Sequence, residues 1–212
     1  LEREERIFRC TCSRKMVAQQ IAAQGGRPGV YPGTCRAARR SPRERHAIRV
    51  IAAGHPVAFH DAVQGRVSED LAKDVGDFII RRADGIFAYQ LAVVVDDAAQ
   101  GVTEVVRGSD LLGSTARQIF LQSALGVATP DYLHLPVVVN AEGDKLSKQT
   151  HAAPLDTSDP APALWQALRF LGQYPPAELK EATLTEIWGW ALTHWNPDAI
   201  PRRRGIAAVA PA

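Results

Sequence analysis

The pattern of apolar and polar residues predicts a strand-rich first region, residues 1–83. A short charged helix is expected at its start, and a second helix over Arg14–Gln24. The segment Gly25–Cys35 is rich in glycine and proline, as expected of a loop. Short apolar runs typical of strands occur at Ile7–Ser13, Ala47–Ala52, Pro56–Val63 and Asp77–Arg82.

The second region, residues 84–150, alternates strand and helix patterns. The near-continuous apolar run at Ile86–Asp97 predicts a buried parallel strand. Further strands are expected at Thr103–Gly108 and His134–Asn140, with a helix at Ser109–Gly126 that ends at a glycine. A turn, AEGD, follows at Ala141–Asp144. Strands joined by helices indicate an α/β fold.

The third region, residues 151–212, is predicted to be short and helical. Helical patterns cover Ala163–Gly172 and Thr185–Trp195. From Pro197 onward the chain is rich in proline, arginine and alanine, so we expect a frayed end there.

The overall composition is ordinary, but the basic residues are unevenly distributed along the chain. The net charge is only +2, with 46% hydrophobic and 23% charged residues, which is ordinary for a globular protein. Basic residues gather at Arg36–Arg45 and Arg202–Arg204. No apolar run is long enough to cross a membrane, and no secretory signal is recognisable. The chain begins with Leu1 and five Glu or Arg residues, so we expect it to be part of a longer protein.

Three cysteines cluster near the start and suggest a metal site. Cys10 and Cys12 are two residues apart on a predicted strand and therefore share a face, and Cys35 follows a flexible loop. Structural zinc takes four ligands, and with no fourth cysteine and no histidine nearby in the sequence the local candidates are Tyr31 and a water. The alternative is three free, partly buried thiols. Clustered cysteines without a signal sequence favour metal or redox chemistry in the cytoplasm.

Two further sites could carry chemistry. The segment KLSKQ, Lys145–Gln149, follows a strand and a tight turn, and its lysines could bind a polyphosphate. The alternative is a solvated surface loop. Arg107 ends a predicted strand and Tyr89 opens another, where ligands of α/β sheets bind, and an arginine there can hold a carboxylate. Otherwise Arg107 forms a surface ion pair and Tyr89 packs as an ordinary aromatic.

Three segments together resemble the glutamyl subgroup of the class I aminoacyl-tRNA synthetases. They are CTCSR near the start, VVVDDAAQGVTEVVRGSDLLGSTARQ, and HLPVVVNAEGDKLSKQ. KLSKQ is similar to the signature KMSKS of that class, with leucine for methionine and glutamine for the last serine. The spacing CTC…YPGTC resembles the zinc site of the glutamyl-queuosine branch, in which three cysteines and one tyrosine hold the metal.

The resemblance implies a fold and a set of roles. The fold would be the C-terminal portion of a Rossmann-type catalytic domain (84–150) with a zinc-binding insertion (1–83) and a short helical C-terminal region (151–212). Cys10, Cys12, Tyr31 and Cys35 would bind structural Zn²⁺, and Tyr89 and Arg107 would bind glutamate. Lys148 would bind ATP, supplied with Mg²⁺, and Lys145 would support it in catalysis.

The family activates glutamate with ATP and transfers it to the queuosine base in the anticodon of tRNA(Asp). We therefore expect a cytoplasmic, monomeric ligase with no membrane contact. The first signature of the class, a HIGH-like motif, is absent and would lie upstream of Leu1. Residues 150–212 are too few for the anticodon-binding domain of a full glutamyl-tRNA synthetase. Two alternatives remain: a tRNA-binding module without catalysis, and an inactive truncated product.

Overall fold

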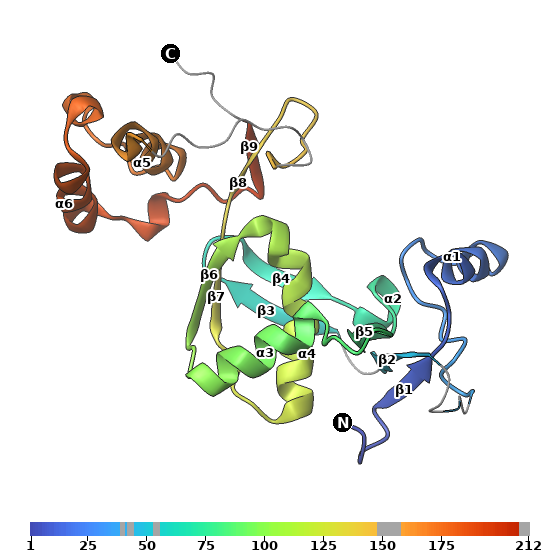
Figure 1. Cartoon of the computed structure of the whole chain (residues 1–212). Helices are drawn as coiled ribbons and strands as arrows, with labels where there is room; N and C mark the ends of the chain where they lie inside the picture. The colour runs from blue at the N-terminus through green and yellow to red at the C-terminus, as the bar shows by residue number, and fades with distance from the viewer. Residues whose placement is uncertain (39–40, 42–44, 53–55, 148–157, 208–212) are drawn as a thin grey trace. The chain divides into compact units, whose positions relative to one another are not determined.

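The computed structural model describes residues 1–38, 41, 45–52, 56–147 and 158–207 (Figure 1). The chain divides into two compact units, each assembled from separate segments. The first unit contains Leu1–Phe59, Arg66–Glu104 and Gly113–Pro130. The second contains His60–Gly65, Val105–Leu112 and Asp131–Ala212.

A three-stranded antiparallel sheet lies in the first unit. Its strands are β1 (Ile7–Cys10), β2 (Ala47–Val50) and β5 (Phe78–Arg81), in that order. Cys10 lies opposite Ala47 in the register of β1 with β2. The three strands confirm the predictions for these segments. The expected helix at the start is wrong, because residues 2–5 form turns closed by Glu5 N–H and Arg6 N–H donating to the carbonyls of Glu2 and Leu1.

A second sheet has four strands, in the order β4, β3, β7, β6. Their bounds are Val57–Asp61 for β3, Gly65–Glu69 for β4, Glu104–Gly108 for β6 and Asp131–Leu135 for β7. β3 and β7 run parallel, with Asp61 opposite Tyr132. The sequence analysis predicted β3 and β6 but not β4, nor the one-turn helix α2 (Leu71–Asp74) that follows it.

The predicted third strand, His134–Asn140, is divided into two. Pro136 separates β7 from β8 (Val137–Val139), because proline has no backbone N–H to continue a ladder. β8 pairs in parallel with β9 (Gly205–Ala207). Part of the segment expected to fray is therefore ordered, since it forms the short helix η4 (Pro197–Ala199) and then β9.

The segment predicted as a strand at Ile86–Asp97 forms a helix, α3 (Tyr89–Gln100). One face of this helix packs on the core: Val94 is buried there and Leu91 and Val93 pack against it, whereas Val95 on the other side is 49% exposed. Gly101 ends the helix in the left-handed conformation, with φ 69°. The strand prediction was therefore wrong, and Tyr89 begins a helix instead of a strand.

The other helices agree with the sequence. α1 (Arg14–Ala23) begins at Ser13, whose hydroxyl accepts from Met16 N–H. The short helix η1 (Ser109–Leu111) leads into α4 (Leu112–Leu125), which ends at Gly126, as predicted. The core of the first unit combines residues of its sheet and of these helices, and its buried members are Val50, Ala52, Leu71, Phe78, Ile80, Val94, Ala116 and Leu121.

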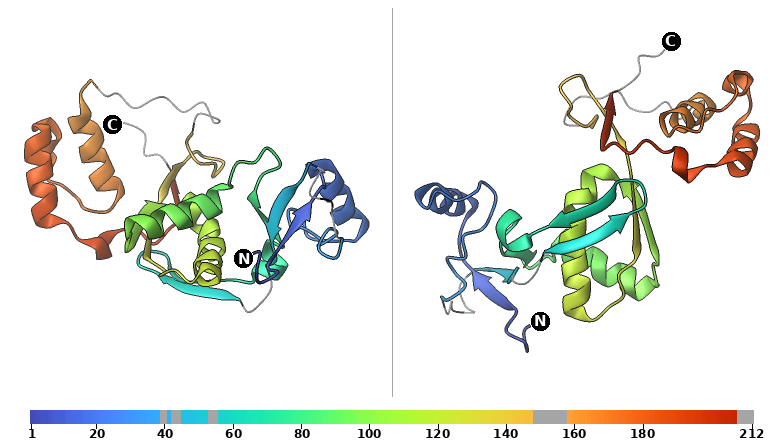
Figure 2. Two further views of the ribbon diagram at one scale, coloured as in Figure 1. Left: turned by 60° about the horizontal axis from the view of Figure 1, so that its bottom comes forward. Right: turned by 180° about the vertical axis from the view of Figure 1, so that it is seen from behind.

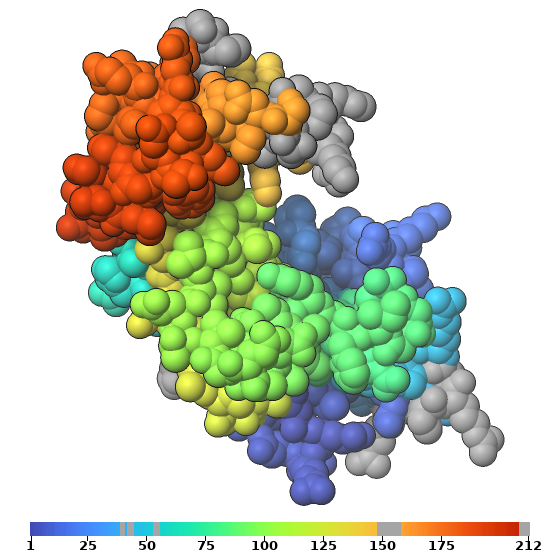
Figure 3. All heavy atoms as spheres, turned by 60° about the vertical axis from the view of Figure 1, so that its left-hand side comes forward, coloured from blue at the N-terminus to red at the C-terminus, as the bar shows by residue number. Residues whose placement is uncertain are grey.

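A helical pair, α5 (Pro160–Phe170) and α6 (Leu184–His194), belongs to the second unit. The two helices lie side by side in both views of Figure 2, joined by η3 (Ala177–Glu181). Their atoms form one packed body, coloured orange to red in Figure 3. Trp165 and Ile187 are buried in the shared core, and Trp165 Nε1–H donates to the carbonyl of Pro176 at 3.1 Å. The predicted helices of the third region are confirmed.

Candidate functional site

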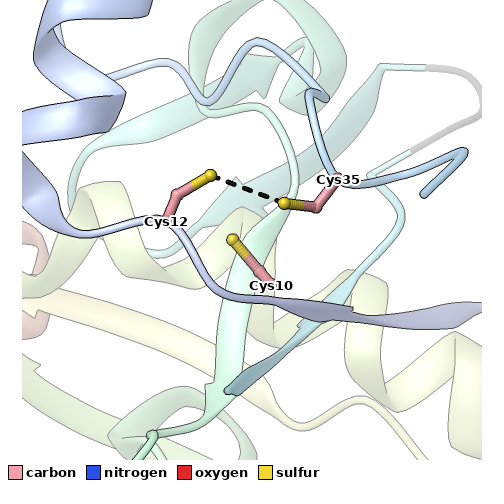
Figure 4. A group of neighbouring side chains, drawn as sticks. All are labelled: Cys10, Cys12 and Cys35. Atoms are coloured by element: carbon pink, nitrogen blue, oxygen red, sulfur yellow. Dashed lines mark hydrogen bonds between the residues drawn. The ribbon is translucent and has the colours of Figure 1, made fainter. Parts of the chain in front are cut away.

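Three cysteines that are distant in sequence meet in the first unit. Cys10 ends β1, Cys12 follows it, and Cys35 comes from the loop after α1. All three Sγ atoms lie within 4.8 Å of one another, and those of Cys12 and Cys35 are 3.4 Å apart. Figure 4 shows the three sulfurs pointing toward a common centre. Among the residues that the structure describes, this is the one group of three or more metal-ligating side chains that is close enough to hold an ion.

The phenol oxygen of Tyr31 belongs to the same cluster. It lies 3.5 Å from Cys10 Sγ and accepts a hydrogen bond from the backbone N–H of Cys35 at 2.8 Å. Tyr31, Cys10 and Cys35 are nearly or fully buried. The Tyr31 ring packs on Phe8 and under the guanidinium of Arg49, 3.9 Å from the ring centroid. The tyrosine that the resemblance selected is therefore placed beside the three thiols.

Neighbouring residues hold this loop in place. A Cβ at Gly76 would lie 2.7 Å from both the backbone N and O of Tyr31, so only glycine fits where these two residues bridge. Arg36 forms a bidentate pair with the buried carboxylate of Asp77, at 3.0 and 2.5 Å. Asp77 also accepts from Ala52 N–H at 2.9 Å. These contacts fasten both ends of the segment that carries Tyr31 and Cys35.

The arrangement fits a tetrahedral metal ion. Zinc–sulfur bonds of about 2.3 Å in a tetrahedron place sulfurs roughly 3.8 Å apart, close to the spacing of these thiols. Burial, the hydrogen bond with Cys35 and repulsion from the other thiols raise the pKa of Cys12 to about 11. Burial is also the main reason that the pKa of Tyr31 is raised. Without a cation these groups are protonated, and a bound divalent cation would reverse that preference.

A second polar cluster lies in the second unit and contains Arg107. The Arg107 Nε–H donates to His134 Nε2 at 3.0 Å, and His134 Nδ1 lies 2.5 Å from Asp61 Oδ2. Asp61 and His134 are completely buried. The three residues come from β6, β7 and β3, which are neighbours in the four-stranded sheet. The sequence analysis singled out Arg107 but missed Asp61 and His134.

The protonation states of this cluster follow from its contacts. Burial alone would raise the pKa of Asp61, but hydrogen bonds from the backbone of Gln64 and from His134 outweigh it, and the pKa falls below its usual value. Burial lowers the pKa of His134, and the neighbouring Arg107 lowers it further, although Asp61 opposes both effects. Asp61 is therefore ionised and His134 neutral near pH 7.

Only part of the KLSKQ segment, Lys145–Gln149, lies within the described residues. Lys145 Nζ forms an ion pair with Asp110 Oδ2 at 2.6 Å, and Asp110 lies in η1, directly after β6. Lys145 also bridges Val139 of β8. Lys148 lies outside the described residues. Tyr89 is half exposed at the start of α3 and belongs to the first unit, whereas Arg107 belongs to the second.

Comparison with known proteins first defines the class. Residues 34–187 match the family described as tRNA synthetases class I (E and Q), catalytic domain. A glutamate-tRNA synthetase from Elizabethkingia anophelis has a similar fold, with a TM-score of 0.70 and 20% identity; the match covers 99% of this chain and 50% of that one. The predicted α/β fold, part of a class I synthetase, is confirmed.

Individual relatives narrow the class. The glutamyl-Q tRNA(Asp) synthetase of Aromatoleum aromaticum is 56% identical over 97% of this chain. That of Dechloromonas aromatica is 50% identical over 96% of this chain. The chain spans 64% of the length of the first relative and 68% of the second. The chain therefore belongs to the glutamyl-Q tRNA(Asp) synthetases, as its motifs predicted. Within the described residues, no helix is long and apolar enough to cross a membrane.

Proposed function

We propose that this protein activates glutamate with ATP and transfers it to the queuosine base in the anticodon of tRNA(Asp). The observation that carries the proposal is the cluster of Cys10, Cys12, Cys35 and Tyr31, together with the high identity to relatives named for this reaction. The three thiols and the phenol would hold a structural Zn²⁺ that joins β1 to the loop before β2. We assign this site to an insertion, residues 1–83, that precedes the second half of the catalytic domain.

Arg107 and Tyr89 are proposed to bind the amino acid. A guanidinium offers parallel N–H donors that match the two oxygens of a carboxylate, which suits the acidic side chain of glutamate. The half-buried position of Arg107 on β6 supports this role, because partial desolvation strengthens a charge-assisted hydrogen bond. The phenol of Tyr89 could donate one further hydrogen bond.

The first chemical step would join glutamate to AMP. An oxygen of the α-carboxylate attacks the α-phosphorus of ATP, the bond from that phosphorus to the β-phosphate oxygen breaks, and pyrophosphate leaves. Negative charge builds on the phosphates, so Mg²⁺ and the ammonium groups of Lys148 and Lys145 would stabilise it. Lys145 would exchange its present partner, Asp110, for a phosphate during this step.

The second step would transfer the glutamyl group to tRNA. A hydroxyl of the queuosine cyclopentene ring attacks the carbonyl carbon of the adenylate and gives up its proton to solvent. An ester forms, and AMP leaves with the electron pair of the broken C–O bond. Positioning of the two substrates accounts for most of the rate in such a transfer.

Arg107→Ala tests the amino-acid site. The substitution should raise the KM for glutamate in ATP–pyrophosphate exchange by roughly 30-fold or more, because a buried carboxylate loses its charge-assisted partner. The KM for ATP should change little. The assay uses the longest chain that the reading frame encodes.

Arg82→Ala is the matched control, since Arg82 forms an exposed ion pair with Asp84. An unchanged KM for glutamate in Arg107→Ala would remove Arg107 from the site. Binding of tRNA(Asp) without any exchange activity would instead favour a tRNA-binding module, the second candidate function.

A further inference from the structure

We propose that His134 and Asp61 are positioning residues for Arg107 and act by setting the tautomer of the histidine. In this arrangement, Asp61 keeps the proton of His134 on Nδ1, and the bare Nε2 holds the guanidinium of Arg107 in one orientation. Only the ligand of Arg107, glutamate, is taken from the proposed function. The hydrogen bonds among the three side chains are independent of that role.

The donors and acceptors of the cluster allow one consistent assignment. Arginine can only donate, so His134 Nε2 must present its lone pair to Arg107 Nε–H. A neutral imidazole then carries its proton on Nδ1, which donates to Asp61 Oδ2 at 2.5 Å. The hydrogen bonds therefore run in one direction, from Arg107 to His134 and from His134 to Asp61.

The carboxylate of Asp61 is itself held firmly. Its Oδ1 accepts from three backbone N–H groups, those of Val63, Gln64 and His134, at 3.1, 2.8 and 3.1 Å. Because these donors satisfy Oδ1, the ionised carboxylate turns Oδ2 toward the imidazole. The Gln64 side chain also donates to the carbonyl of His134 at 2.9 Å, so β3 and β7 are joined at this point by several contacts.

The contacts also determine the plane of the guanidinium. Arg107 lies over the Tyr132 ring, 5.4 Å from its centroid, and Tyr132 stacks on His134 with an angle of 18° between the rings. Because His134 holds the Nε–H and the Tyr132 ring covers one face, the Arg107 guanidinium has little freedom to rotate. In a guanidinium the edge between the two Nη groups faces away from Nε–H, so a carboxylate held in a fork would meet that edge.

A purely structural role would not require this polarity. Three backbone N–H groups account for the buried carboxylate of Asp61, but they do not account for a histidine placed between that carboxylate and Arg107. The pair is instead directed from Asp61 through His134 to an arginine that is only half buried. This geometry resembles other sites where a carboxylate sets the tautomer of a histidine that acts on a third group.

Asp61→Asn tests the inference directly. The asparagine oxygen can still accept from the backbone N–H groups, but its NH₂ group donates to His134 Nδ1 and moves the imidazole proton to Nε2. Nε2–H then faces Arg107 Nε–H, and two donors oppose each other. We expect the ¹⁵N spectrum of histidine-labelled 212-residue chain to show Nε2 unprotonated in the wild type and protonated in Asp61→Asn.

Kinetics provide the second measurement. In the longest chain of the reading frame, Asp61→Asn and His134→Leu should raise the KM for glutamate by about 10-fold or more, with the KM for ATP changed less than about 2-fold. His134→Gln should largely restore the KM for glutamate, because its amide oxygen can accept from Arg107 Nε–H near the position of Nε2.

The two readouts separate this inference from the proposed function. A wild-type His134 protonated on Nε2 would overturn the inference whatever Arg107 binds, and this holds even if Asp61→Asn does not fold. A tautomer change without any rise in the KM for glutamate would also overturn it, provided that Arg107→Ala does raise that KM. If Arg107→Ala has no effect, the assignment of Arg107 to glutamate fails instead.

Discussion

At the scale of single residues, a metal ion that binds the cysteine cluster must displace protons from its ligands. The pKa of Cys12 is raised to about 11 and that of Tyr31 is raised as well, both chiefly by burial. Without a cation, Cys12 and Tyr31 therefore keep their protons near pH 7. A divalent cation would convert them to strong ligands and join β1 to the loop that carries Cys35.

We predict about one Zn²⁺ per chain in protein prepared with zinc, measured by mass spectrometry of the metal after desalting. Cys35→Ser should lose most of it, because a neutral hydroxyl is a far weaker ligand than a thiolate. The neighbouring Thr34→Ala is the matched control and should keep its metal, since Thr34 contacts Gln20 and not the cluster. Less than about 0.2 Zn²⁺ per wild-type chain would contradict the assignment.

The sequence predicted this cluster far better than it predicted the surroundings of Arg107. Cys10, Cys12 and Cys35 are rare residues at a recognisable spacing, and the resemblance then selected Tyr31. Asp61 and His134 carry no such mark, because 73 positions separate them and only the pairing of β3 with β7 brings them together. The position of His134 between two leucines of β7 was the one available hint.

At the scale of elements, predictions succeeded where an end signal agreed with the periodicity. The glycine at position 126 marked the end of α4, and all three strands of the first sheet were located by their apolar runs. The prediction for Ile86–Asp97 failed because three consecutive valines favour a strand locally. In the folded chain the segment is a helix, which buries one of its faces against the core. β4 (GRVSE) contains a single apolar residue and β9 has only three residues, so neither gives a clear pattern.

The end of α3 gives a test at this scale. Gly101 has φ 69° with open space around its missing Cβ, so Gly101→Ala should destabilise the protein by about 1 kcal/mol through backbone strain alone. Gly113 in α4 also has open space but no positive φ, and Gly113→Ala should stabilise by roughly 0.5–1 kcal/mol. Urea unfolding followed by circular dichroism measures both. Equal effects of the two substitutions would argue against a helix that ends at Gly101.

At the scale of the whole molecule, the family and the fold class were predictable, but the assembly of the units was not. Each unit is built from three separate segments, as expected when strands of one sheet come from distant parts of a chain. No local pattern reveals such an arrangement. The division into regions 1–83, 84–150 and 151–212 stays a prediction, as does a monomeric state.

The most direct test of the central claim is transfer of labelled glutamate to tRNA(Asp) by the longest chain of the reading frame. Two tRNA preparations are compared, one with queuosine and one from cells that cannot make it, both without their 3′-terminal adenosine. We predict ATP-dependent labelling of the queuosine-containing tRNA and none of the other. Equal labelling of both, or labelling only when the 3′-terminal adenosine is present, would contradict the account.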